Sequence, residues 1–106
     1  MEADIYLVYS TCGNIGDAKR IARSLVEDRL VACVNIIPVV HSVYWWKGNI
    51  EEENEIAILA KTTKDRIKEV ISKIKELHTY ELPDIIAIPV VKGYKKFLQY
   101  IRDETS

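Results

Sequence analysis

Residues Ala32 to Thr62 read ACVNIIPVVHSVYWW, then KGN, then IEEENEIAILAKT. Two extended arms flank Lys47-Gly48-Asn49, where Gly and Asn tolerate the positive φ that a hairpin turn needs. Pro38 interrupts the first arm. Because proline cannot donate to a ladder, it predicts an edge position or a bulge, with a bend in the strand. The stretch therefore predicts one long β-hairpin.

The arms of this hairpin are longer than the domain that should carry them. A compact chain of 106 residues has a radius of gyration of about 13 Å, hence a diameter of roughly 33 Å. An arm of about 14 extended residues spans roughly 46 Å. The overhang carries Tyr44, Trp45 and Trp46, which are costly to leave in water, and it has open strand edges. We expect another copy of the chain to cover it.

The segments on either side of the hairpin alternate between strand and helix patterns. Apolar runs predict strands within residues 4–10 and 84–91. Apolar residues at helical spacing predict helices over residues 14–29 and 67–77, and a short closing helix over residues 94–101. The order β-α-β-β-α-β is typical of a ferredoxin-like α+β fold, in which two helices cover one face of a four-stranded antiparallel sheet. We expect residues 1–106 to form one domain.

Composition excludes several classes of partner. With 15 Lys+Arg against 16 Asp+Glu, the net charge of -1 gives no reason to expect nucleic acid or an anionic membrane. No apolar run approaches the ~20 residues of a membrane-spanning helix, and the N-terminus is acidic where a signal peptide is basic. Cys12 and Cys33 lack the spacing of a disulfide scaffold or a zinc site, which indicates reduced thiols. We expect a cytoplasmic protein with no membrane insertion.

The predicted topology brings two loops together. The first strand lies between the third and the fourth, so residues 10–14 should approach residues 78–83. Cys12, His78, Tyr80 and Glu81 would meet there. A thiolate with an imidazole suits copper or zinc, so Cys12 and His78 are candidate metal ligands, with Glu81 or water completing the shell. Such binding should fade as pH falls through the imidazole range, near 6.5.

Structural roles compete with this interpretation. Cys12 can be a packing residue, His78 can favour a helix C-terminus, and Tyr80 and Glu81 can simply tie down their loop. Lys61 is either a lysine whose stem covers apolar surface or part of an anion site or ion pair. These alternatives stay open at the level of sequence.

Other residues of the hairpin have simpler interpretations. Cys33 is typical of a small core residue. Trp45 and Trp46 point to opposite faces of a regular strand, so one can line an aromatic pocket while the other is exposed. Residues 51–55 include four glutamates, typical of a solvated strand edge and, less often, of a surface that collects cations.

No catalytic motif is present. Gly13 and Gly16 do not form a phosphate-binding loop, and the sequence contains neither a Walker loop nor a nucleophile elbow. An RNA-binding module of the same topology would need stacking aromatics within a basic motif, and neither appears. We therefore expect a protein that is not an enzyme.

Several fragments, in this order and spacing, resemble the CutA divalent-cation tolerance family along nearly the whole chain. They are Ala32-Cys33-Val34-Asn35, Tyr44-Trp45-Trp46-Lys47-Gly48 followed by Ile50-Glu51 and Glu55, Lys61-Thr62, and Leu77-His78 with Tyr80-Glu81 and Pro83. The resemblance implies a ferredoxin-like fold, a homotrimer joined through the long hairpins and a cytoplasmic location. It also implies a role in tolerance or response to copper and other divalent metal ions.

The sequence departs from the family at three positions. Thr79 stands where the family usually has proline, and members associated with copper have cysteine and histidine at the positions of Ser10 and Leu77. Only His78 carries over as a metal ligand, and Cys12 is a substitute that the topology suggests.

The family also resembles PII-type signalling trimers in architecture. This likeness implies an alternative function, a signalling or scaffold trimer that binds a small anionic ligand in the clefts between subunits. Lys61, Tyr80, Glu81 and Trp46 are the candidate residues for such a cleft.

Overall fold

The computed structural model describes residues 4–106 and has the predicted element order. A short 3-10 turn (Lys64–Arg66) leads into α2, and the closing helix is present. The elements are β1 (Ile5–Cys12), α1 (Ile15–Glu27), β2 (Cys33–Trp46), β3 (Asn49–Thr63), α2 (Ile67–Leu77), β4 (Ile85–Pro89) and α3 (Lys95–Glu104).

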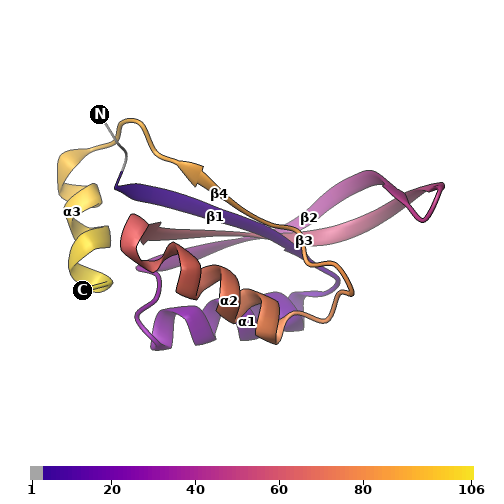
Figure 1. The fold of residues 1–106 in the computed structure, drawn as a ribbon, viewed down its shortest axis with the longest axis horizontal. Helices are drawn as coiled ribbons and strands as arrows, with labels where there is room; N and C mark the ends of the chain where they lie inside the picture. The colour runs from indigo at the N-terminus through magenta and orange to yellow at the C-terminus, as the bar shows by residue number, and fades with distance from the viewer. Residues whose placement is uncertain (1–3) are drawn as a thin grey trace.

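The four strands form one antiparallel sheet in the order β2-β3-β1-β4. As predicted, β1 lies between β3 and β4. Helices α1 and α2 lie side by side against one face of the sheet, and α3 lies at one end (Figure 1). The ferredoxin-like α+β fold is thus confirmed. None of the helices among the described residues is long and apolar enough to cross a membrane.

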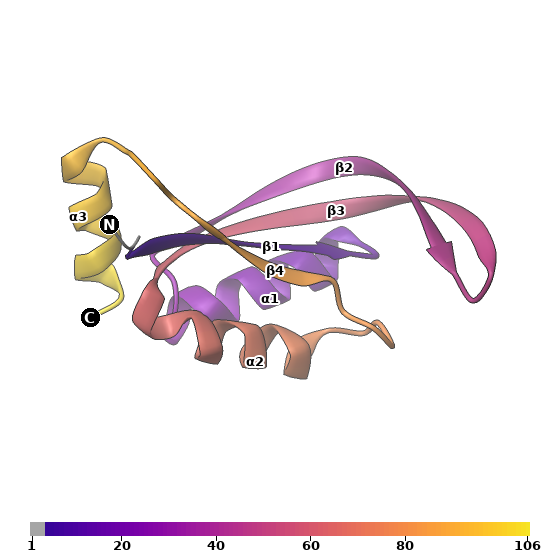
Figure 2. The same cartoon turned by 45° about the horizontal axis from the view of Figure 1, so that its top comes forward.

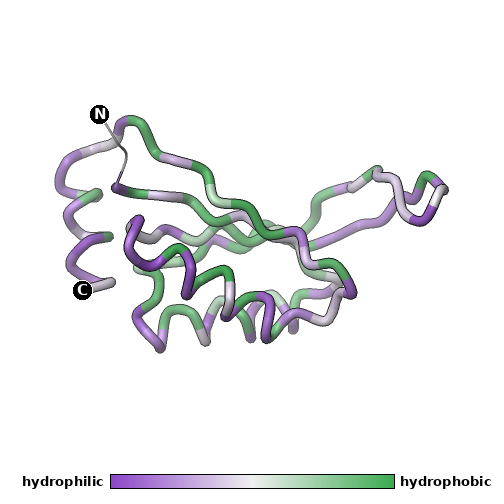
Figure 3. Tube along the Cα trace, viewed as in Figure 1, coloured by the Kyte–Doolittle hydropathy of each residue, from purple (hydrophilic) through white to green (hydrophobic). Residues whose placement is uncertain are grey.

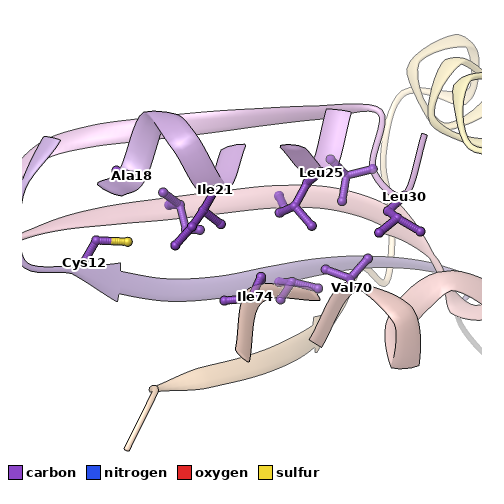
Figure 4. Close-up of a cluster of buried hydrophobic side chains, with 11 residues drawn as sticks. Cys12, Ala18, Ile21, Leu25, Leu30, Val70 and Ile74 are labelled. Carbon is purple, nitrogen blue, oxygen red and sulfur yellow. The ribbon is translucent and has the colours of Figure 1, made fainter. Parts of the chain in front are cut away.

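The main core fills the space between the sheet and the two helices. Alternate residues of β1 and β3 point toward the helices, because successive side chains of a strand face opposite sides. Figure 4 shows the α1 residues Ala18, Ile21 and Leu25 facing the α2 residues Val70 and Ile74 across this core. The cluster is completed by Val8, Cys12, Leu30, Val31, Ile58 and Ala60.

The opposite face of the sheet, here called the open face, has no α1 or α2 above it (Figure 2). Helix α3 covers only one end, where Ile101 packs with Ile5 and Ala32. Further along the sheet, Ile86 and Ile88 of β4 are 56% and 40% exposed. The open face therefore leaves apolar surface in contact with water.

The hairpin extends beyond the sheet as a two-stranded ribbon, as predicted (Figures 1 and 2). Strand β1 pairs with β3 only over Ile56–Thr63, so the rest of β3 pairs with β2 alone. The molecule measures 43 × 29 × 22 Å. Lys47 and Gly48 have φ of 49° and 82°, the left-handed values typical of a two-residue hairpin turn.

A β-bulge at Pro38, one of the two alternatives that the sequence predicted, sets which side chains of the ribbon share a face. The register changes from Ile37 opposite Ala57 to Val40 opposite Glu55, so β2 holds one extra residue. Beyond the bulge, Ser42 and Tyr44 therefore lie opposite Glu53 and Glu51, on the open face. Figure 3 shows the contrast between the mixed β2 arm of the ribbon and its hydrophilic β3 arm.

Candidate functional site

A cleft of about 650 Å³ lies on the open face, where the ribbon leaves the sheet. Its walls come from the ribbon, the end of β1 and the loop before β4. The lining residues are Tyr9, Thr11, Ser42, Tyr44, Trp46, Glu51, Glu53, Glu55, Tyr80, Glu81, Leu82 and Asp84. We call this the acidic cleft, since five of these residues are carboxylic acids.

Glu55 is the buried carboxylate of the cleft, with 6% of its surface exposed. Its Oε2 accepts hydrogen bonds from the Tyr80 hydroxyl at 2.6 Å and the Thr11 hydroxyl at 3.0 Å. Burial raises the pKa of Glu55, but hydrogen bonds from Ser42, Tyr80 and Thr11 outweigh it, and the net pKa lies below the usual value. Glu55 is therefore a carboxylate at neutral pH.

Thr11 also contacts Asp84, which directly precedes β4. The Thr11 backbone N–H donates to Asp84 Oδ1 at 3.3 Å, and the Thr11 hydroxyl lies within hydrogen-bond distance of Asp84 Oδ2. The same hydroxyl contacts Glu55, yet a hydroxyl carries only one proton. It can donate to one carboxylate at a time, so the Glu55–Asp84 pair has one donor fewer than its contacts require.

The acidic cleft has a strongly negative electrostatic character. Burial and the hydrogen bond to Glu55 raise the pKa of Tyr80, and the hydrogen bond to Glu53 raises the pKa of Tyr44 to about 12. No Lys, Arg or His lines the cleft within residues 4–106. At its edge Lys47 Nζ lies 3.5 Å from Glu81, an exposed pair that contributes little. The cleft thus attracts cations and repels anions.

His78 joins its loop to the end of β1. Its Nδ1 accepts a hydrogen bond from the Tyr80 backbone N–H at 3.1 Å, so the proton of the neutral ring is on Nε2. That Nε2–H donates to the Thr11 carbonyl oxygen at 2.7 Å. The two loops therefore converge as predicted. Neither ring nitrogen has a free lone pair for a metal ion in this arrangement.

Cys12 lies in the main core, with 1% of its surface exposed. Figure 4 shows its thiol inside the apolar cluster, near Ala18 and Ile21. Burial, followed by the nearby carboxylates of Asp17, Asp84 and Glu55, raises the pKa of this thiol to about 11. Within residues 4–106, no three His, Cys, Asp or Glu side chains are grouped to hold a metal ion. A copper ion shared by Cys12 and His78 would need both side chains to move.

The other predicted cleft residues divide into two groups. Trp46, Tyr80 and Glu81 line the acidic cleft, and the exposed Trp45 points away from it, as the alternation predicted. Lys61 lies further along β3 on the open face, opposite Leu7 and Cys33, and does not line the cleft. Sequence reasoning missed Glu55, which was grouped with the solvated glutamates although it directly precedes the apolar part of β3.

The fold and the overhanging hairpin define a class of ferredoxin-like α+β proteins, and comparison with known proteins identifies the family. A family model described as CutA1 divalent ion tolerance protein matches residues 6–104. The divalent-cation tolerance protein CutA of Archaeoglobus fulgidus is 44% identical over 98 residues, which cover 92% of this chain and 94% of that protein. The chain therefore belongs to the CutA1 divalent ion tolerance family.

Further comparisons agree with this assignment. Protein CutA of Homo sapiens is 42% identical over 97 residues, covering 92% of this chain and 54% of the human protein. This chain thus matches about half the length of its human relative. The crystal structure of CutA from Xylella fastidiosa superposes with a TM-score of 0.95 at 39% identity, covering 98% of this chain and 100% of that one.

Proposed function

We propose that the protein acts as a cytoplasmic homotrimer in tolerance or response to divalent metal ions, and that it is not an enzyme. Family membership supports the link to divalent ions. The names of its relatives describe tolerance and no reaction. The two free cysteines, Cys12 and Cys33, support a reducing compartment such as the cytoplasm.

The main support for the proposed trimer is the apolar surface that one copy leaves exposed at both ends of its long axis. On the ribbon, Val43, Trp45 and Ile50 are 61%, 71% and 61% exposed. Near α3, at the other end, Val91 and Tyr94 are also largely exposed. One copy cannot bring its own two ends together, so each end needs a neighbour. Contacts of this head-to-tail kind form a closed ring when the rotation between copies closes, and three copies make the proposed ring.

A charged residue on the ribbon tests this assembly. Trp45→Asp should convert trimers to folded monomers in sedimentation velocity runs at micromolar concentration, because it places a charge in the proposed contact. Val26→Asp is the matched control, since Val26 is an exposed apolar residue of α1, on the helical side of the sheet. Equal assembly of the two variants would contradict the role of the ribbon.

The metal ion is the second part of the proposal. Copper, or another divalent ion, at Cys12 and His78 with Glu81 or water stays a prediction, and it requires the two main ligands to leave their present contacts. Calorimetric titration of the trimer with copper and zinc, on wild type and on His78→Ala, tests it. Loss of binding in the variant supports the predicted ligand, and unchanged binding contradicts it.

The alternative is a PII-like scaffold that binds a small anion between subunits through Lys61, Tyr80, Glu81 and Trp46. The negative charge of the acidic cleft disfavours an anion in the single copy, and Lys61 lies outside that cleft. Titration with nucleotides distinguishes the two functions. We expect no heat of nucleotide binding, and saturable binding would favour the alternative.

A further inference from the structure

Two charged residues of β3 each lack a charged partner. Lys61 is half-buried on the open face between Leu7 and Cys33, and no carboxylate pairs with it in the described part of the chain. Glu55 is buried in the acidic cleft, where hydroxyl groups are its donors. A buried charge is stable when an opposite charge and hydrogen bonds compensate the loss of water.

The two residues cannot pair within one copy. They lie on the same strand, six residues apart, which corresponds to about 20 Å in an extended chain. Both face the open side of the sheet, because residues at even spacing along a strand share a face. An ion pair between them therefore requires two copies whose open faces meet.

The open face itself offers this meeting, because Ile86 and Ile88 leave apolar surface exposed on it. The acidic cleft lies at the base of the ribbon, whereas Lys61 lies toward the end that α3 covers. When the open faces of two copies meet head to tail, the acidic cleft of one copy can approach Lys61 of the next, a lysine without an acid partner. We propose that the acidic cleft is completed between copies, with the Lys61 ammonium of one copy paired with the Glu55 carboxylate of the next.

The pairing would also supply the missing donor of the cleft. The single proton of the Thr11 hydroxyl leaves either Glu55 or Asp84 short of a hydrogen bond. An ammonium group carries three donors and no acceptor, so it can serve both carboxylates while neutralising one charge. This inference rests on the proposed homotrimer and adds to it a residue that each copy contributes to its neighbour's cleft.

A double-mutant cycle tests the pair. Lys61→Met and Glu55→Gln should each raise the trimer dissociation constant by about tenfold or more, because each leaves the opposite charge buried and unpaired. The trimer dissociation constant of the double variant should be no higher than the higher of the two single-variant constants. Exchanging the charges, with Lys61→Glu and Glu55→Lys in one chain, should restore assembly relative to either single substitution.

Control substitutions test whether a lysine other than Lys61 pairs with Glu55. Lys68→Met removes an exposed lysine of α2 and should leave assembly unchanged. Lys92→Met removes an exposed lysine near α3, and coupling of Glu55 to Lys92 in place of Lys61 would overturn the assignment. Where a Glu55 variant fails to fold, the Glu55 carboxyl is titrated by NMR in the Lys61→Met trimer. Its pKa should rise, and an unchanged pKa would overturn the pair.

The outcome for the trimer and the outcome for the pair are distinguishable. A monomeric wild-type protein overturns the proposed homotrimer and this inference together. A wild-type trimer in which the two single substitutions are additive overturns the Lys61–Glu55 pair alone.

Discussion

The Tyr80 hydroxyl donates a 2.6 Å hydrogen bond to the Glu55 carboxylate and joins residues 25 positions apart in the sequence. The bond connects the loop before β4 to the point where β3 leaves the sheet. His78 fastens the same loop to Thr11 of β1. The shape of the acidic cleft therefore depends on a loop that is bound to two different strands.

Replacing Tyr80 with phenylalanine tests how much this hydrogen bond contributes to the free energy of unfolding. Tyr80→Phe leaves the buried Glu55 carboxylate with one donor fewer, and hydrogen bonds to charged groups contribute about 1.5–3 kcal/mol. We expect the free energy of unfolding, measured with guanidinium chloride, to fall by about that amount. Tyr6→Phe is the matched control, because the Tyr6 hydroxyl makes no hydrogen bond within the described residues. Equal stability of the two variants would show that the Tyr80 hydroxyl does not support Glu55.

The pKa of Glu55 predicts a pH dependence of stability. Its folded pKa lies below the ordinary value of 4.5, so ionised Glu55 stabilises the fold fully above 4.5. This stabilisation is lost as pH falls through the lower, folded pKa. The difference in unfolding free energy between wild type and Glu55→Gln should therefore be constant above pH 4.5 and shrink below it. A difference that grows on acidification would contradict the shift.

Copper binding through Cys12 should depend on pH in a way that the sequence did not predict. The Cys12 thiol has a pKa of about 11, so a metal ion must displace its proton at neutral pH. Copper affinity through this thiolate should rise about tenfold per pH unit above neutrality, beyond the range in which imidazole titrates. Competition titrations between about pH 7 and 9 measure it, on the alkaline side of the imidazole range. A flat profile would exclude the thiolate as a ligand.

The hairpin turn is a separate test of the ribbon. Gly48 has φ of 82°, and a methyl group added at its Cα would meet only open space, so Gly48→Ala suffers backbone strain without a clash. We expect a loss of about 1 kcal/mol in unfolding free energy. Lys47 also has positive φ, and Lys47→Asn should stabilise the turn slightly, since asparagine tolerates that region. A stabilising Gly48→Ala or a destabilising Lys47→Asn would contradict the turn geometry.

Local sequence patterns predicted most of the fold because helix starts, strand interruptions and arm lengths depend on residues that are neighbours in the sequence. The helix predicted from residue 14 onward begins at Ile15, because the Asn14 side chain caps α1 by accepting a hydrogen bond from the Asp17 N–H at 2.8 Å. Pro38 was expected to mark an edge or a bulge, and it lies within the register change of the edge strand β2. The overhanging hairpin followed from arm length alone.

The site was harder to predict because it depends on register between distant strands. Glu55 is buried because its strand places it next to Thr11 and within reach of Tyr80, contacts that no local pattern reports. The bulge brings Ser42 and Tyr44 onto the cleft side, so alternation counted through Pro38 would assign them to the wrong face. Cys12 was assigned to a loop after the predicted strand, but β1 extends to Cys12, which therefore shares the core face with Val8 and packs there.

Sedimentation equilibrium of the wild-type protein, from about 1 to about 100 µM, measures whether three copies associate through their hairpins. Such association predicts one species with three times the 12.2 kDa mass of a single chain across this range. A well-folded species of 12.2 kDa at the same concentrations would contradict it, because the overhang would then need no neighbour.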